Sequence, residues 1–109
     1  MQREDILKIS KEIITEELEK AGYNVLEIIL FGSRARGDES PDSDWDFYVV
    51  VDKDIDFKSK KNIIVSIRRK MALNKIPNDI LIQSKNESEK RKINPGYVSY
   101  NVFKEGMRI

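Results

Sequence analysis

Two apolar runs joined by a short polar loop constrain the fold of this chain more than any other feature. The runs NVLEIILFG (24–32) and DWDFYVVVD (44–52) are rich in β-branched and aromatic residues, which is typical of buried strands. The loop between them contains Pro41, which breaks regular structure. We therefore predict two strands of a buried sheet, with a short helical turn over residues 33–37 after the first.

The remaining segments predict helices around one further strand. Apolar residues recur at helical spacing over residues 4–21 and again over residues 57–74, where Asp56 is in position to be the N-cap. The run NDILIQS (78–84) predicts a third strand. Residues 97–106 predict a last helix, because their apolar side chains again fall on one face.

This order of elements predicts one α/β (α+β) domain over residues 1–109. We expect a small mixed sheet of three to four strands, with helices packed on one face of it. The length of 109 residues is enough for one core. A capping-box pattern at Ser84 and Glu87 predicts a short helix directly after the third strand.

Composition limits the chemistry that the chain can perform. It has no Cys and no His, which excludes thiolate chemistry and removes the commonest general base and zinc ligand. Twenty Lys and Arg against nineteen Asp and Glu give a net charge of +1, so non-specific or specific nucleic-acid binding is not indicated. Without a signal peptide or a membrane-length apolar run, we expect a cytoplasmic protein and no membrane partner.

Two familiar motifs fail on this chain. Residues 32–37 have the glycine spacing of a P-loop, but two acidic residues follow where Lys and Ser or Thr are needed, and these would repel phosphate. Residues 42–46 resemble the start of an EF-hand loop. That loop needs Gly at its sixth position and Glu at its twelfth, where this chain has Phe47 and Lys53.

Acidic residues at the starts of two predicted strands indicate a metal site. Asp44 and Asp46 point to the same side of their strand, whereas Trp45 and Phe47 point to the other side, into packing. Two such carboxylates repel each other, and magnesium would reverse that cost because it binds carboxylate oxygens shared with substrate phosphates. A pair of ions can hold both oxygens of a phosphoryl or nucleotidyl displacement. Asp79, which also starts an apolar strand, is the candidate third ligand and proton acceptor.

The end of the first strand has residues suited to anionic oxygens. Gly32 lets the backbone approach a phosphate closely. Ser33 begins a helical turn, where free N–H groups and a hydroxyl can bind phosphate oxygens. Arg34 and Arg36 lie close by in the sequence, and we favour Arg36 as the phosphate ligand.

Together these residues resemble the nucleotidyltransferase superfamily that includes DNA polymerase beta, and more narrowly its minimal nucleotidyltransferase domains in prokaryotes. Those domains are about as long as this chain, and the resemblance covers nearly all of it. It implies that Gly32 and Ser33 hold a triphosphate, and that Asp44 and Asp46 bind two Mg²⁺ ions, or Mn²⁺ in their place. It implies that Asp79 completes the catalytic and metal-binding site.

The resemblance also implies a reaction and a partner. The expected reaction moves a nucleoside monophosphate, AMP from ATP, to a hydroxyl acceptor. Minimal domains of this kind resemble the antitoxin of a two-gene system, whose partner is an all-helical ribonuclease toxin of the HEPN type. A hydroxyl of that partner, for example a tyrosine, is the expected acceptor. The chain departs from the family pattern at Trp45 and Phe47, which replace the more usual aliphatic residues. The sequence ends at Ile109, so we also expect no second domain to position an acceptor.

Several alternatives stay open at the level of sequence. The domain could bind a nucleotide or a partner without turnover, or modify small molecules as the antibiotic-modifying nucleotidyltransferases do. Asp44 and Asp46 could be solvated residues at a strand end, Ser33 an N-cap, and Asp79 an exposed edge residue. The basic residues of 58–70 fit a solvated helix face, and the last helix's aromatic residues fit a core or an interface. The sequence leaves open the preferred base, the acceptor and the oligomeric state, with a homo-oligomer as one alternative.

Overall fold

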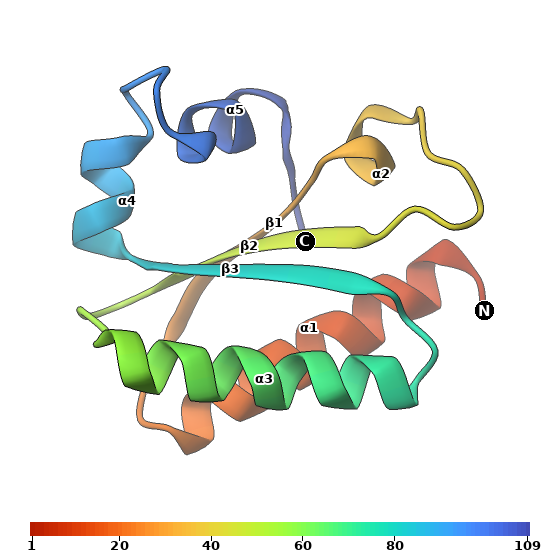
Figure 1. Cartoon of the computed structure of the whole chain (residues 1–109), viewed down its shortest axis with the longest axis horizontal. Helices are drawn as coiled ribbons and strands as arrows, with labels where there is room; N and C mark the ends of the chain where they lie inside the picture. Colours follow the sequence, from red (N-terminus) through yellow and green to blue (C-terminus); the bar gives the residue numbers. More distant parts are fainter.

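A four-stranded mixed sheet in the order β3-β2-β1-β4 forms the centre of the molecule. Its long strands β1, β2 and β3 are labelled in Figure 1. In the computed structural model, which describes all 109 residues, β1 runs antiparallel to β2 and β4, while β2 and β3 are parallel. The elements in chain order are α1 (Arg3–Lys20), β1 (Val25–Phe31), α2 (Ser33–Arg36), β2 (Trp45–Val51), α3 (Phe57–Leu73), β3 (Asn78–Ser84), α4 (Lys85–Arg91), α5 (Val98–Glu105) and β4 (Met107–Arg108).

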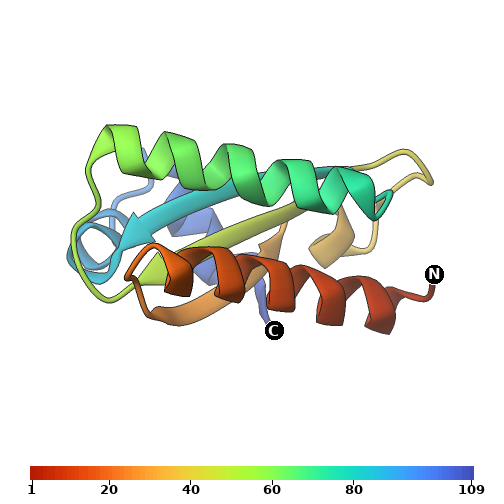
Figure 2. The same cartoon turned by 90° about the horizontal axis from the view of Figure 1, so that it is seen from below.

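The two long helices, α1 and α3, lie side by side on one face of the sheet (Figure 2). Alternate residues of β2 point into this layer, where Trp45 is 4% exposed and Phe47 is fully buried. Ile67 and Met71 of α3 pack in the same core cluster, as does Leu18 of α1. The predicted inward packing of the two aromatic residues of β2 is confirmed.

The opposite face of the sheet is also covered, so the expectation of helices on one face only was wrong. Helices α4 and α5 lie there (Figure 1), and Tyr48, Val50 and Ile29 of the sheet pack against Val102 of α5. The Tyr48 hydroxyl shares a hydrogen bond of 2.6 Å with the Ser99 hydroxyl. Strand β2 is apolar at consecutive positions, which is the pattern of a strand buried on both faces.

Helix boundaries follow the sequence signals closely. The helices predicted over 4–21 and 57–74 occur as α1 and α3 within one residue at each end. Asp56 caps α3 by accepting a hydrogen bond of 3.0 Å from the Ser59 N–H. None of the helices is long and apolar enough to span a bilayer.

Strand β4 was not predicted, because two residues are too few for a strand pattern. It pairs with β1 opposite Ile29 and Leu30. The chain enters it through Gly106, where a Cβ would overlap a methyl group of Ile29 and the carbonyl oxygen of Val102. Only glycine fits this approach of the chain to the sheet.

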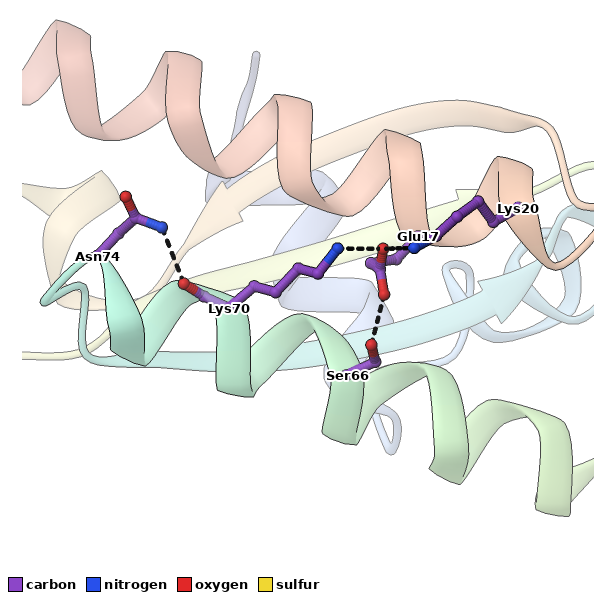
Figure 3. A network of polar contacts seen from close by, with 5 residues as sticks. All are labelled: Glu17, Lys20, Ser66, Lys70 and Asn74. Atoms are coloured by element: carbon purple, nitrogen blue, oxygen red, sulfur yellow. Dashed lines mark hydrogen bonds and ion pairs between the residues drawn. The ribbon is translucent and has the colours of Figure 1, made fainter.

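A buried carboxylate ties α1 to α3 (Figure 3). Glu17 is 7% exposed and accepts hydrogen bonds of 2.8 Å from both Lys20 and Lys70. It also accepts a hydrogen bond from the Ser66 hydroxyl. The hydrogen bonds from Lys20, Lys70 and Ser66 lower the pKa of Glu17 to about 2. The two helices are therefore joined by an ionic network beside their apolar contacts.

Candidate active site

The predicted site residues meet at one end of the sheet, where β1 ends and both β2 and β3 begin. Asp46 is paired in register with Phe31, directly before Gly32, and on its other side with Asp79. Asp44 lies one residue before β2. Gly32, Asp46 and Asp79 therefore form a row across three neighbouring strands, and the expectation that the strands of Asp44 and Asp79 lie side by side is confirmed.

Asp46 and Asp79 also share a face of the sheet. Asp46 alternates with Phe47, and Asp79 with Ile80, and both of these neighbours point into the α1–α3 layer. The two carboxylates therefore lie on the side covered by α5. Asp46 is half-buried, whereas Asp79 and Asp44 are exposed.

The electrostatics of Asp46 reflect the two carboxylates beside it. Burial raises the pKa of Asp46 above its ordinary value, and the charges of Asp79 and then Asp44 raise it further. The positive charge of Arg36 acts in the opposite direction. Burial and the neighbouring negative charges thus disfavour the ionised form of Asp46.

Gly32 packs directly against this carboxylate. Its φ of 73° lies in the left-handed region, and a Cβ here would overlap Oδ2 of Asp46. Gly32 is the N-cap of α2, and its carbonyl oxygen accepts bonds of 3.1 Å from the Ala35 and Arg36 N–H groups. Ser33 is thus the first residue of the helical turn rather than its N-cap.

The two arginines of α2 have different surroundings. The Arg34 guanidinium donates to the carbonyl oxygens of Ser43 at 2.9 Å and Pro41 at 3.3 Å, and lies 4.5 Å from the centroid of the Trp45 ring. It holds the loop before β2 in place. Arg36 is exposed and makes one ion pair, of 3.2 Å, with Asp38. The guanidinium of Arg36 is therefore more accessible to an anion than that of Arg34.

A cleft of ≈ 350 Å³ opens beside Gly32 and Arg36. Its far wall is α5, which contributes Val98, Asn101 and Glu105. The volume lies within the range of small-molecule sites. Sequence reasoning missed these α5 residues, because only the tertiary structure brings a helix near the chain terminus over the end of β1.

The acidic residues are chemically suited to bind a divalent ion, although their side chains do not form a complete metal site in this structure. No group of three or more acidic side chains stands close enough to hold an ion. All the candidate ligands are carboxylate oxygens, which Mg²⁺ prefers. A cation beside Asp46 would offset the repulsion from Asp79 and Asp44 that raises its pKa. The residues therefore fit a divalent ion, and the full ligand set stays a prediction.

The fold and this row of residues define a protein of the polymerase-beta-like nucleotidyltransferase class. The chain belongs to the family described as "Polymerase beta, Nucleotidyltransferase", whose profile matches residues 11–109. A search of curated proteins finds no match.

Several solved structures share the fold. A toxin–antitoxin complex with AMP-PNP is similar with a TM-score of 0.59 and 16% identity, over 90% of this chain and 70% of that one. A mutant of the toxin–antitoxin MntA-HpeT is similar with a TM-score of 0.56 and 15% identity, over 91% of this chain and 70% of that one. A second mutant of the toxin–antitoxin MntA-HpeT is similar with a TM-score of 0.55 and 16% identity, over 91% of this chain and 70% of that one. At such identities the likeness concerns the fold alone.

Proposed function

We propose that this protein transfers a nucleoside monophosphate, AMP from ATP, to a hydroxyl group and releases pyrophosphate. The observation that carries the proposal is the close approach of Gly32 to Asp46, which supports a phosphate-binding role for the turn beside the acidic row. Membership of the nucleotidyltransferase family supports the same reaction class.

Each residue of the row has a proposed role. The turn of Gly32 and Ser33, with Arg36, binds the triphosphate. Asp44, Asp46 and Asp79 hold two Mg²⁺ ions, for which Mn²⁺ can substitute. When bound, these ions neutralise phosphate charge and favour ionisation of the attacking hydroxyl.

The proposed reaction balances with these groups. The acceptor oxygen forms a bond to the α-phosphorus, and the bond from that phosphorus to its bridging oxygen breaks. Pyrophosphate leaves with the bonding electron pair. The proton of the acceptor hydroxyl passes to Asp79, because the chain has no His and a carboxylate is the available base.

We further propose that the acceptor is a hydroxyl, such as that of a tyrosine, on a toxin partner of the HEPN type, which gives this protein an antitoxin role. The toxin–antitoxin assemblies among the similar solved structures support a partner, and the AMP-PNP in one of them supports an adenine nucleotide.

The reaction can be tested with ATP labelled at the α-phosphate, Mg²⁺ and the product of the neighbouring gene. We expect label on that protein, and a loss of about 100-fold or more with Asp46→Asn, because the half-buried carboxylate at the centre of the site is removed. Asp42→Asn is the matched control, since Asp42 is exposed in the loop outside the row. A stable complex that takes no label from any triphosphate would instead indicate a binding module without turnover.

A further inference from the structure

A second cleft opens on the other side of the acidic row. It has a volume of ≈ 660 Å³ and extends from Asp44 over the end of α3 to the start of β3. We call it the α3 cleft. It shares no lining residue with the cleft beside Gly32. Among its lining residues are Asp44, Arg68, Arg69, Lys75, Pro77 and Asn78.

The position of the α3 cleft suits an attacking group. Nucleotidyl transfer places the attacking oxygen and the leaving pyrophosphate on opposite sides of the phosphorus. Gly32, at the end of β1, is on the triphosphate side, and Asp46 and Asp79 follow in order across β2 and β3. An acceptor therefore arrives from the β3 side, and Asp44, one residue before β2, is the member of the acidic row that lines the α3 cleft.

The α3 cleft is basic, and its cations have no acidic partners. Arg68, Arg69 and Lys75 take part in none of the ion pairs of the chain, whereas the neighbouring Lys70 is paired with Glu17. The Arg68 guanidinium donates a bond of 3.1 Å to the main-chain oxygen of Asn78. Cations near a helix C-terminus can be purely stabilising, so charge alone does not identify a site.

A buried side chain in the wall of the α3 cleft supplies the independent observation. Asn78 is 6% exposed, and its Nδ2 donates a bond of 3.0 Å to the Ile76 carbonyl oxygen. Its Oδ1 is the one buried side-chain polar atom of the chain without a partner. Buried acceptors are nearly always satisfied, so this oxygen marks a place where a donor such as a ligand N–H is missing.

We propose that the α3 cleft binds an acidic protein segment, the segment that carries the acceptor hydroxyl. The acceptor role of this segment rests on the proposed function, whereas binding of the segment does not require the reaction. Unpaired cations attract carboxylates, and a peptide backbone carries N–H donors of the kind that the unpaired Oδ1 of Asn78, in the cleft wall, can accept. No aromatic side chain lines the cleft to stack on bases, which favours protein over nucleic acid.

The test measures binding of a short fluorescein-labelled peptide, rich in Glu and Asp around one Tyr, to the full chain without nucleotide. Arg69→Glu/Lys75→Glu reverses two exposed cations of the cleft. Lys58→Glu/Lys61→Glu makes the same change in net charge with exposed lysines at the opposite end of α3. We expect Kd to rise about tenfold or more in the cleft variant and by less than about threefold in the control, because close charges dominate screened distant ones.

An equal rise in the Kd of the peptide in both variants would overturn the inference, because the change in net charge alone would then explain the loss of binding. Displacement of the peptide by a single-stranded oligonucleotide of equal charge at lower concentration would also overturn it, in favour of nucleic acid. If label reaches the partner equally well with parent and cleft variant, the inference fails while the proposed function stands. If the peptide depends on the cleft but no label is ever transferred, docking stands and the proposed function fails.

Discussion

At the scale of single residues, the candidate active site depends on the close approach of Gly32 to Asp46. Both Gly32 and Gly37 have positive φ, 73° and 85°, but only Gly32 has a neighbour that an added Cβ would overlap. The two glycines therefore separate the cost of backbone strain from the cost of pushing Asp46 aside.

The first prediction compares alanine at these two positions. Gly37→Ala should lower the free energy of unfolding by about 1 kcal/mol through strain alone, and should leave nucleotide binding unchanged. Gly32→Ala should cost more, because Asp46 has to move as well, and should abolish the stabilisation by Mg²⁺ and ATP. Urea unfolding with and without ligand measures both effects. Equal behaviour of the two variants would remove Gly32 from the site.

The second prediction separates the arginines of α2. Arg34→Ala should destabilise the protein by about 1–2 kcal/mol, because it removes hydrogen bonds to the loop carbonyls and the stacking on Trp45. Arg36→Ala should leave the melting temperature unchanged but weaken ATP binding about tenfold through the loss of one phosphate contact. Melting curves and a nucleotide titration of both variants measure these effects. The reverse result would exchange the roles of Arg34 and Arg36.

At the scale of the elements, the Glu17 network makes the packing of α1 on α3 sensitive to pH. The pKa of Glu17 in the folded protein, about 2, is below the ordinary value of 4.5. The folded state therefore binds this proton less readily than the unfolded state. The stabilisation by ionised Glu17 is complete above about pH 4.5 and is lost as the pH falls toward 2.

The third prediction follows from that sign. Glu17→Gln should lower the free energy of unfolding at pH 7 by about 1–2 kcal/mol, a figure reduced for solvent screening because both lysines are partly exposed. The difference between parent and variant should shrink as the pH falls below 4. Glu16→Gln, on the exposed side of the same helix, is the control and should change little at either pH. A constant difference from pH 7 to pH 2.5 would contradict the assigned pKa.

The helices and the long strands could be predicted from the sequence because their signals are local. Apolar spacing and caps such as Asp56 are contained within a few residues. Strand β4 carries no such signal, since its two residues gain their conformation only by pairing with β1. The packing of helices on the second face could have been predicted from Tyr48 and Val50. These apolar residues alternate with the residues of β2 that point toward α1 and α3, so both faces of the strand are apolar.

The candidate residues and the neighbouring positions of their strands were predicted from the sequence, but the surroundings of each side chain were not. Strand order follows from long-range pairing, which brings Asp79 into register with Asp46 although 33 residues separate them. Arg34 and Arg36 differ in their contacts because Arg34 reaches the carbonyl oxygens of the loop, whereas Arg36 pairs with Asp38. The α5 wall and the α3 cleft have no sequence motif, because each forms where distant segments meet.

At the scale of the whole molecule, the row of carboxylates opposes folding when no ligand is bound, because burial and like charges both disfavour ionised Asp46. A ligand that binds only the folded state raises its stability by RT ln(1 + [L]/Kd), about 2.7 kcal/mol at a hundredfold excess over Kd. The assembled site exists only in the folded chain, so a metal–nucleotide complex should stabilise the entire domain.

The most direct measurement is therefore the melting temperature of the parent and of Asp46→Asn, each alone, with Mg²⁺, with ATP and with both. For the parent we predict a rise of about 10 °C with both ligands at a hundredfold excess over Kd, well above the rise with either alone. Asp46→Asn should melt no lower than the parent without ligand, because one repelling charge is gone, and should show no combined rise. A combined rise of equal size in the parent and in Asp46→Asn would show that the nucleotide binds elsewhere and would contradict the assignment of this site.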